Sequence, residues 1–136
     1  MSRLYLDACT IIYLVEAVSP FHVTVTARLL PQRTDPQSRL ITSRLSRLEC
    51  RVQPLKNADT RLLAAYDAFF SRDRLILREV TAEIIERATD LRARYGFKTP
   101  DALHLATAIE EKADLFLTGD KALARCAEVK VEVLEE

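Results

Sequence analysis

The sequence predicts an α/β fold with a mainly parallel β-sheet. Short apolar segments, which are typical of buried strands, alternate along the chain with longer segments of helical composition. The composition is that of a globular protein, because 49% of the residues are hydrophobic and 29% are charged, while only two are glycine. At 136 residues the chain has the usual size of one compact domain, so we expect a single domain over residues 1–136.

In the first half of the chain, apolar strands precede helices of regular composition. The expected elements are a strand at Arg3–Leu6, helices at Thr10–Glu16 and Val23–Leu30, a strand at Leu40–Thr42 and a helix at Ser43–Val52. Pro31 is expected to close the second of these helices, and the turn-rich segment 32–38 is expected to form a loop.

The same alternation continues in the second half of the chain. The expected elements are a helix at Asn57–Phe70, a strand at Leu75–Leu77, helices at Thr81–Tyr95 and Thr99–Lys112, a strand at Leu115–Leu117, a short helix at Lys121–Cys126 and a strand at Val129–Leu134. Asn57 and Thr99 are expected to cap their helices, and Gly96 is expected to end the helix before it.

Four acidic residues stand close to the predicted strands and helix starts. Asp7 and Asp120 follow the strands at 3–6 and 115–117, so both should lie at the carboxyl edge of the sheet, where parallel sheets bind ligands. Asp101 is in the first turn of the helix before the second of these strands, and Glu49 is inside the helix at 43–52. The sequence therefore suggests one acidic site at this edge.

Each acid also has an ordinary structural explanation. Asp7 and Asp120 are suitable helix caps, Asp101 is a favourable anion in a first helical turn, and Ser46 with Glu49 fits a capping box. However, Asp7 and Asp101 stand beside apolar segments, where several carboxylates would repel one another and lose hydration unless cations neutralise them. Ligand sets made only of oxygen select Mg²⁺ or Mn²⁺, which activate water for phosphodiester cleavage without a nucleophilic side chain.

The net charge is zero, but six arginines are concentrated between residues 28 and 51. They are Arg28, Arg33, Arg39, Arg44, Arg47 and Arg51. Such a region is either a surface for a polyanion such as RNA or a solvated helix face. We take Arg44, Arg47 and Arg51 as candidate RNA-binding residues.

The three cysteines indicate a reducing environment. Cys9, Cys50 and Cys126 are far apart and lack the spacing of a zinc site or of a disulfide framework. No apolar run approaches the roughly 20 residues that cross a bilayer, and the N-terminus does not have the pattern of a secretion signal. We therefore expect a cytoplasmic protein that does not bind membranes.

Four segments in register resemble the motifs of the PIN domain, and more narrowly those of the VapC toxins of VapBC toxin–antitoxin pairs. These segments are Leu4–Ile12, Thr42–Glu49, Thr99–Ala108 and Leu117–Asp120. The resemblance implies a three-layer α/β/α sandwich, Mg²⁺- or Mn²⁺-dependent endoribonuclease activity, a homodimer and a VapB-like antitoxin that blocks the site. It also implies that Asp7, Glu49, Asp101 and Asp120 are the metal-binding catalytic acids, supported by Thr118.

Some residues near these motifs depart from the pattern or have a structural explanation. Cys9 stands where the family usually has a small hydroxyl or amide side chain, and Thr10 is a possible substitute. His104 follows Asp101 by three positions, but we expect a packed or partly exposed histidine with no function. Tyr5 is expected to belong to the core.

Two other functions are compatible with this reading of the sequence. A non-catalytic RNA-binding module would keep the fold and the arginines without cleaving RNA. A phosphoryl-transfer α/β domain would instead use Asp7 as the phosphate acceptor, although such domains usually have a second acid near the first, and here Ala8 and Cys9 follow Asp7. Cleavage of RNA separates these functions from the nuclease, and phosphorylation of Asp7 identifies the last.

Overall fold

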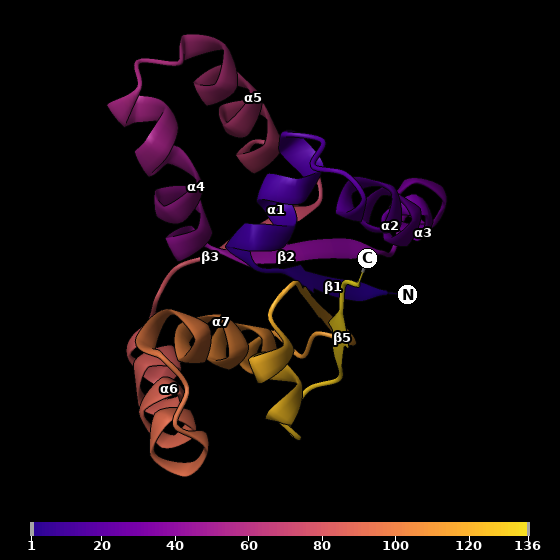
Figure 1. Ribbon diagram of the computed structural model, residues 1–136. Helices are drawn as coiled ribbons and strands as arrows, with labels where there is room; N and C mark the ends of the chain where they lie inside the picture. Colours follow the sequence, from indigo (N-terminus) through magenta and orange to yellow (C-terminus); the bar gives the residue numbers. More distant parts are fainter. Residues whose placement is uncertain (1, 136) are drawn as a thin grey trace.

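The computed structural model describes residues 2–135 and contains one five-stranded parallel sheet (Figure 1). The strand order is β3-β2-β1-β4-β5. The strands are β1 (Arg3–Leu6), β2 (Arg39–Ser43), β3 (Leu75–Arg78), β4 (Leu115–Thr118) and β5 (Val131–Val133). All four neighbouring pairs run parallel, as predicted from the alternation of strands and helices.

Helices cover both faces of this sheet, which confirms the three-layer α/β/α sandwich (Figure 1). On one face lie α1 (Ala8–Val15), α2 (Phe21–Arg28), α3 (Leu30–Thr34), α4 (Arg44–Lys56) and α5 (Thr60–Phe70). On the other face lie α6 (Ala82–Tyr95), α7 (Thr99–Glu110) and the 3₁₀ helix η1 (Lys121–Arg125).

Alternation along the strands divides the hydrophobic core into two parts. In β1, Leu4 and Leu6 pack with the helices α1, α2, α4 and α5, whereas Tyr5 between them packs with α6 and α7. All three side chains are buried, because β1 lies in the middle of the sheet. The register pairs Leu6 with Leu117, so β1 and β4 end side by side and the residues that follow them share one edge.

The structure corrects several predicted element boundaries. Pro31 does not close a helix but stands in the first turn of α3, where its missing N–H has no helical partner to lose. Helix α4 continues past residue 52 to Lys56 and includes Pro54. Asn57 is the C-cap of α4, while Asp59 caps α5 by accepting a hydrogen bond from the Leu62 N–H.

The structure also defines both ends of α6 and the start of α7. Thr99 is the first residue of α7 instead of its cap, and Lys98 occupies the cap position without a side-chain hydrogen bond. Thr81 caps α6, which begins at Ala82, and Gly96 ends that helix as predicted, with a φ of 75°. This left-handed conformation explains the glycine, since a side chain is strained there. In the described part of the chain, no helix is long and apolar enough to cross a membrane.

Candidate active site

Asp7 is the most buried of the four predicted acids. It follows β1 directly, caps α1, and is only 6% exposed. Its Oδ1 accepts hydrogen bonds from the Thr10 N–H at 3.1 Å and from the Thr10 hydroxyl at 2.8 Å. The Thr10 hydroxyl also lies 2.9 Å from the Leu117 carbonyl oxygen of β4. The cap predicted for Asp7 is therefore present, and it fixes the orientation of the carboxylate.

Thr118 holds the second oxygen of the same carboxylate. At the end of β4, its hydroxyl donates to Asp7 Oδ2 at 2.5 Å and accepts from the Asp120 N–H at 3.1 Å. A charged acceptor strengthens such a bond. The contact predicted for Thr118 is present, and it ties the end of β1 to the loop that carries Asp120.

Cys9 occupies the edge of this arrangement as a protonated thiol. Its Sγ donates to Asp7 Oδ1 at 3.1 Å and accepts from the Gly119 N–H at 3.3 Å. Burial raises the pKa of the Cys9 thiol to about 12, and the adjacent Asp7 carboxylate acts in the same direction. The thiol is thus a hydrogen-bond donor at neutral pH, while Thr10 supplies the hydroxyl contact to Asp7.

Asp101 lies within electrostatic reach of both Asp7 and Asp120. Burial raises the pKa of Asp101 above its ordinary value, and the negative charges of Asp120 and Asp7 raise it further. His104 and Lys98 act in the opposite direction on the same pKa. Asp120 is exposed, and its Oδ1 caps η1 by accepting from the Ala122 N–H at 2.9 Å. Two of the other predicted acids therefore act on Asp101 at this edge.

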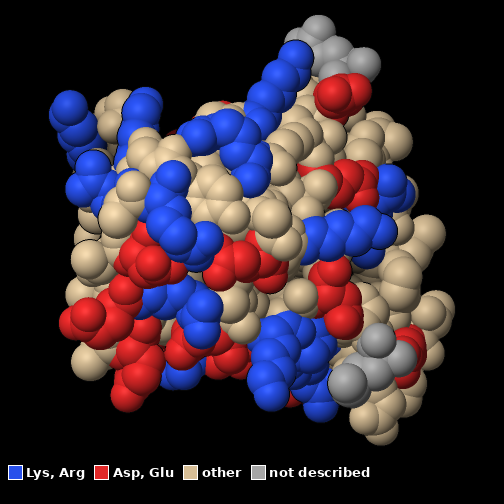
Figure 2. All heavy atoms as spheres, turned by 90° about the horizontal axis from the view of Figure 1, so that it is seen from below, with Lys and Arg blue, Asp and Glu red and all other residues tan. Residues whose placement is uncertain are grey.

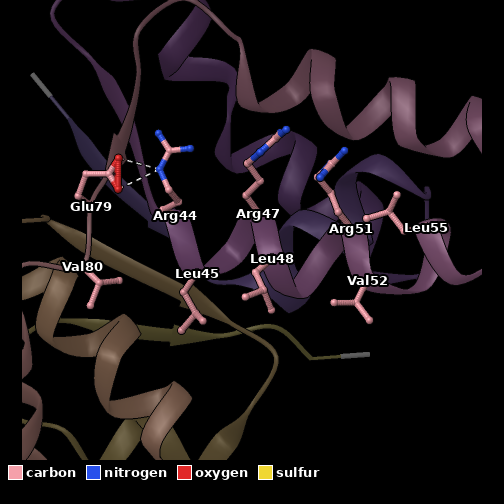
Figure 3. A pocket seen from close by; sticks show the side chains of 9 residues that line it. All are labelled: Arg44, Leu45, Arg47, Leu48, Arg51, Val52, Leu55, Glu79 and Val80. Atoms are coloured by element: carbon pink, nitrogen blue, oxygen red, sulfur yellow. Dashed lines mark hydrogen bonds and ion pairs between the residues drawn. The ribbon is translucent and has the colours of Figure 1, made fainter.

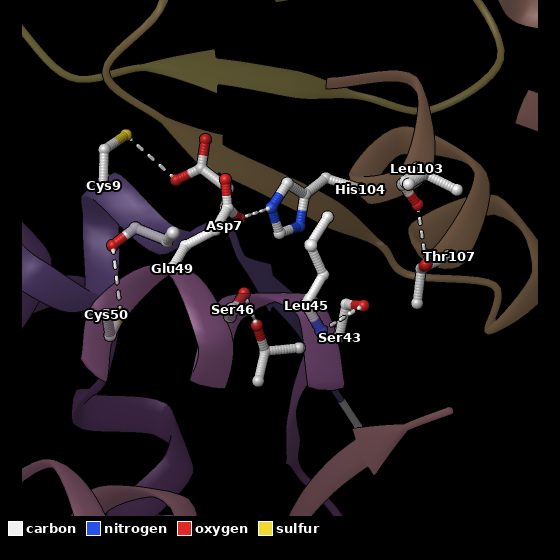
Figure 4. A network of polar contacts seen from close by, with 12 residues as sticks. Asp7, Cys9, Ser43, Leu45, Ser46, Glu49, Cys50, Leu103, His104 and Thr107 are labelled. Atoms are coloured by element: carbon white, nitrogen blue, oxygen red, sulfur yellow. Dashed lines mark hydrogen bonds and ion pairs between the residues drawn. The ribbon is translucent and has the colours of Figure 1, made fainter. Parts of the chain in front are cut away.

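Glu49 lies on α4 and contacts a histidine instead of another acid (Figure 4). Its Oε1 is 2.7 Å from His104 Nε2, and His104 Nδ1 is 2.7 Å from the Tyr5 hydroxyl. The capping box suggested for Ser46 and Glu49 is absent, because Ser43 caps α4 and Ser46 lies inside the helix. The sequence alone gives His104 no function. Only its position one helical turn after Asp101 indicates that it could lie near the site.

The donor set of these residues fits a hard divalent cation. Asp7, Glu49, Asp101 and Asp120 offer carboxylate oxygens, the ligands that Mg²⁺ and Mn²⁺ prefer. The mutual repulsion that raises the pKa of Asp101 is the kind that a cation relieves. In the described residues 2–135, no three His, Cys, Asp or Glu side chains are already arranged to hold one ion. The charges of Asp7 and Asp120 act on Asp101, but the side chains are not yet arranged around a common point where an ion could bind.

The three candidate arginines form ion pairs on α4 (Figure 3). Arg44 lies 2.8 Å from Glu79, and Asp67 lies 3.1 Å from Arg47 and 3.0 Å from Arg51. Figure 3 shows Leu45, Leu48 and Val52 pointing away from the arginine side chains, although all of these residues line the same groove. The surface of the molecule on the side of α6 and α7, seen in Figure 2, carries basic and acidic side chains interspersed with one another.

An α/β/α sandwich with the buried Asp7 and further carboxylates at the carboxyl edge of its parallel sheet defines a class of α/β proteins with an acidic site at that edge. Within this class the family is clear, because the model of the PIN domain matches residues 4–129. The chain belongs to the PIN domain family. No curated protein sequence matches it significantly.

Solved structures confirm the likeness of the fold. A chain of VapBC2 from Rickettsia felis, bound to a promoter DNA fragment, is 16% identical with a TM-score of 0.76, covering 98% of this chain and 99% of that one. A toxin–antitoxin complex from Klebsiella pneumoniae gives 23% identity, a TM-score of 0.67 and 98% coverage of both chains. VapC20 of Mycobacterium tuberculosis, a toxin that cleaves the sarcin–ricin loop, gives 21%, 0.69, and 93% and 98% coverage.

Proposed function

We propose that this PIN domain is a metal-dependent endoribonuclease and the VapC-like toxin of a toxin–antitoxin pair. The observation that carries the proposal is the buried Asp7 carboxylate, which is held from both sides and lies within electrostatic reach of Asp101, which Asp120 also influences. Burying a carboxylate beside other carboxylates costs free energy, and a site that binds a cation recovers it. A purely structural cap needs neither the burial nor the neighbouring acids.

In this proposal Asp7, Glu49, Asp101 and Asp120 hold Mg²⁺ or Mn²⁺. When bound, such an ion lowers the pKa of a water that attacks phosphorus and stabilises charge on the phosphate oxygens. The protein itself fixes the acids: the Thr10 and Thr118 hydroxyls hold the two oxygens of Asp7 in one orientation. Fixed ligands spare the site the entropy of ordering them when substrate binds.

Partners and setting follow from the same proposal. Two of the similar structures are toxin–antitoxin complexes, which supports a VapB-like antitoxin as the partner of this chain. The substrate is RNA, and the chain acts in the cytoplasm as one PIN domain over residues 1–136. Free cysteines at positions 9, 50 and 126 agree with a reducing compartment.

The arginines of α4 are proposed to bind RNA in competition with their ion pairs. Changing Arg44, Arg47 and Arg51 together to Ala should weaken RNA binding and reduce its dependence on salt. Asp67 pairs with two of them, so Asp67→Asn should free those two guanidinium groups and strengthen binding. Fluorescence anisotropy with a labelled RNA at several salt concentrations measures both effects. Unchanged affinity and slope in both variants would exclude this surface.

The homodimer is proposed to form through an apolar stripe of α4 that lies beside the arginines and shares one groove with them. Leu48, Val52 and Leu55 are 50–60% exposed and share one face of the helix, where they line an open groove of about 620 Å³ (Figure 3). Across a two-fold axis the same stripe meets itself, so one apolar surface serves both copies. In light scattering, Leu48→Glu should produce a monomer. Val23→Glu, at a 70% exposed position on α2, is the matched control and should not.

The decisive experiment is the incubation of purified protein with total cellular RNA in Mg²⁺, in Mn²⁺ and in EDTA. Cleavage is expected with either ion and should cease in EDTA. Asp101→Asn should be inactive, while Asp73→Asn, which precedes β3 at the opposite edge of the sheet, should cleave normally. RNA binding without any cleavage would favour the non-catalytic module, and phosphorylation of Asp7 by a phosphodonor would favour the phosphoryl-transfer domain.

A further inference from the structure

A hydrogen-bonded chain runs from Tyr5 in the core through His104 to Glu49, and Figure 4 shows its contact between His104 and Glu49. We infer that Tyr5 and His104 are positioning residues, which hold the Glu49 carboxylate in the orientation that its role as a metal ligand requires. The inference rests on the proposed function, since it names the groups that prepare one acid of the proposed site. Its basis is the contact geometry around His104.

Both nitrogens of the His104 ring have a partner at hydrogen-bond distance. The residue is 3% exposed, and its Nε2 and Nδ1 lie 2.7 Å from Glu49 Oε1 and 2.7 Å from the Tyr5 hydroxyl. An ionised carboxylate only accepts hydrogen bonds, so Nε2 carries a proton and donates it to Glu49. In the neutral imidazole Nδ1 is then the acceptor, and the Tyr5 hydroxyl donates to it. The chain of donors therefore runs from Tyr5 through His104 to Glu49.

The far end of this chain is rigid. Tyr5 is fully buried in β1 at the centre of the sheet, and its ring is stacked on Phe116 with centroids 4.9 Å apart and planes at 10°. The His104 ring meets the Tyr5 ring edge-on at 67°, with centroids 5.9 Å apart. Two rings packed in this way leave the histidine little freedom to turn. The Nε2–H thus points toward α4 from a fixed position.

Glu49 is the flexible member that gains from this arrangement. Its side chain is 31% exposed, and no hydrogen bond within the described residues other than that from His104 is formed by its carboxylate. His104 holds Oε1 and thereby fixes the orientation of the whole carboxylate. The second oxygen, Oε2, is then available to a cation. Histidines and carboxylates that orient a metal ligand in this way commonly contribute about 10–100-fold to metal affinity or activity.

The same helix therefore prepares two acids of the site. Helix α7 carries Asp101 directly, and one turn later its His104 reaches across to Glu49 on α4. The i, i+3 spacing places both residues on neighbouring positions of one helix face. The ring nitrogens of an ordinary core histidine would form hydrogen bonds with backbone groups of the core. Here Nε2 instead contacts a partly exposed acid of the proposed site.

Tyr5→Phe tests the inference, because it removes one hydroxyl and keeps the ring stacked on Phe116. Binding of Mn²⁺ to the metal-free protein, measured by calorimetry, should weaken about 10-fold, and RNA cleavage at subsaturating Mn²⁺ should fall with it. Tyr95→Phe is the matched control: it also removes a hydroxyl from a stacked tyrosine, one that accepts from the Ala127 N–H, and it should change neither quantity.

His104 variants provide a second test if Tyr5→Phe does not fold. His104→Gln keeps an N–H donor and should retain more Mn²⁺ affinity than His104→Leu, which has none. In the wild type, long-range ¹H–¹⁵N spectra should show Nε2 of His104 as the protonated nitrogen. An Nε2 without a proton, or Mn²⁺ affinities of Tyr5→Phe and His104→Leu equal to that of the wild type, would overturn the inference while the proposed function stands. A wild-type chain that neither binds Mn²⁺ nor cleaves RNA would overturn both.

Discussion

Replacing Asp7 separates its hydrogen bonds from its charge. Asp7→Asn keeps a carbonyl oxygen that can accept from the Thr10 N–H, so the cap of α1 survives. The new amide faces the Thr118 hydroxyl, which accepts as well as donates and can turn to suit it. Asp7→Ala, by contrast, leaves the Thr10 N–H, the Thr118 hydroxyl and the Cys9 thiol without this acceptor in a site that is 6% exposed in the wild type.

The expected magnitudes follow from these contacts. For Asp7→Ala, loss of the cap costs about 1 kcal/mol and the stranded Thr118 hydroxyl about 1–3 kcal/mol, so unfolding free energy should fall by roughly 2–4 kcal/mol. For Asp7→Asn, exchanging a charge-assisted bond for a neutral one costs about 1 kcal/mol, and relief of the repulsion with Asp101 offsets part of it. In the metal-free protein, Asp7→Asn should therefore lie within about 1 kcal/mol of the wild type.

The assay is urea unfolding followed by circular dichroism in EDTA, with RNA cleavage in Mg²⁺ measured on the same preparations. Both variants should be inactive, although only Asp7→Ala is much less stable. An Asn variant as unstable as the Ala variant would show that the charge itself holds the fold. Full cleavage by the Asn variant would remove Asp7 from the proposed catalytic acids.

Three further predictions concern the metal and two local structures. Mn²⁺ should raise the melting temperature of the wild type and not that of Asp101→Asn, and equal shifts in scanning calorimetry would contradict the assignment of Asp101. Asp59→Ala should lower the free energy of unfolding by about 1 kcal/mol and Asn57→Ala by much less, as urea titrations can verify, because only Asp59 caps α5. Gly96→Ala should cost about 1 kcal/mol or more at its φ of 75°, and an unchanged urea midpoint would argue against the left-handed cap.

The fold could be predicted because its signals are local and periodic. Each strand is recognisable as a short apolar run, and Gly96 marks the end of α6 as predicted. The misplaced boundaries lie where two local explanations compete. Pro31 is equally compatible with the end of one helix and the first turn of the next, and two cap-type residues, Asn57 and Asp59, lie two positions apart in the α4–α5 turn.

The candidate site was predictable as a set of acids but not as a set of contacts. The sequence predicts the strands but not their order in the sheet. It is this order, with β4 next to β1, that brings Thr118 to Asp7. The contact between His104 and Glu49 joins helices on opposite faces of the sheet, so no spacing in the sequence reveals it. The ion pairs of Asp67 likewise depend on the packing of α5 against α4.

The position of β4 has a consequence for biosynthesis. This strand is next to β1 in the sheet, although more than a hundred residues separate them in the chain, and it supplies the Thr118 hydroxyl to Asp7. A nascent chain still lacking β4 leaves β1 with one open edge and Asp7 without that donor. Asp120 emerges later still. A ribosome that stops before this point therefore releases a polypeptide with an incomplete site, and under the proposed function such a truncated product should not cleave RNA.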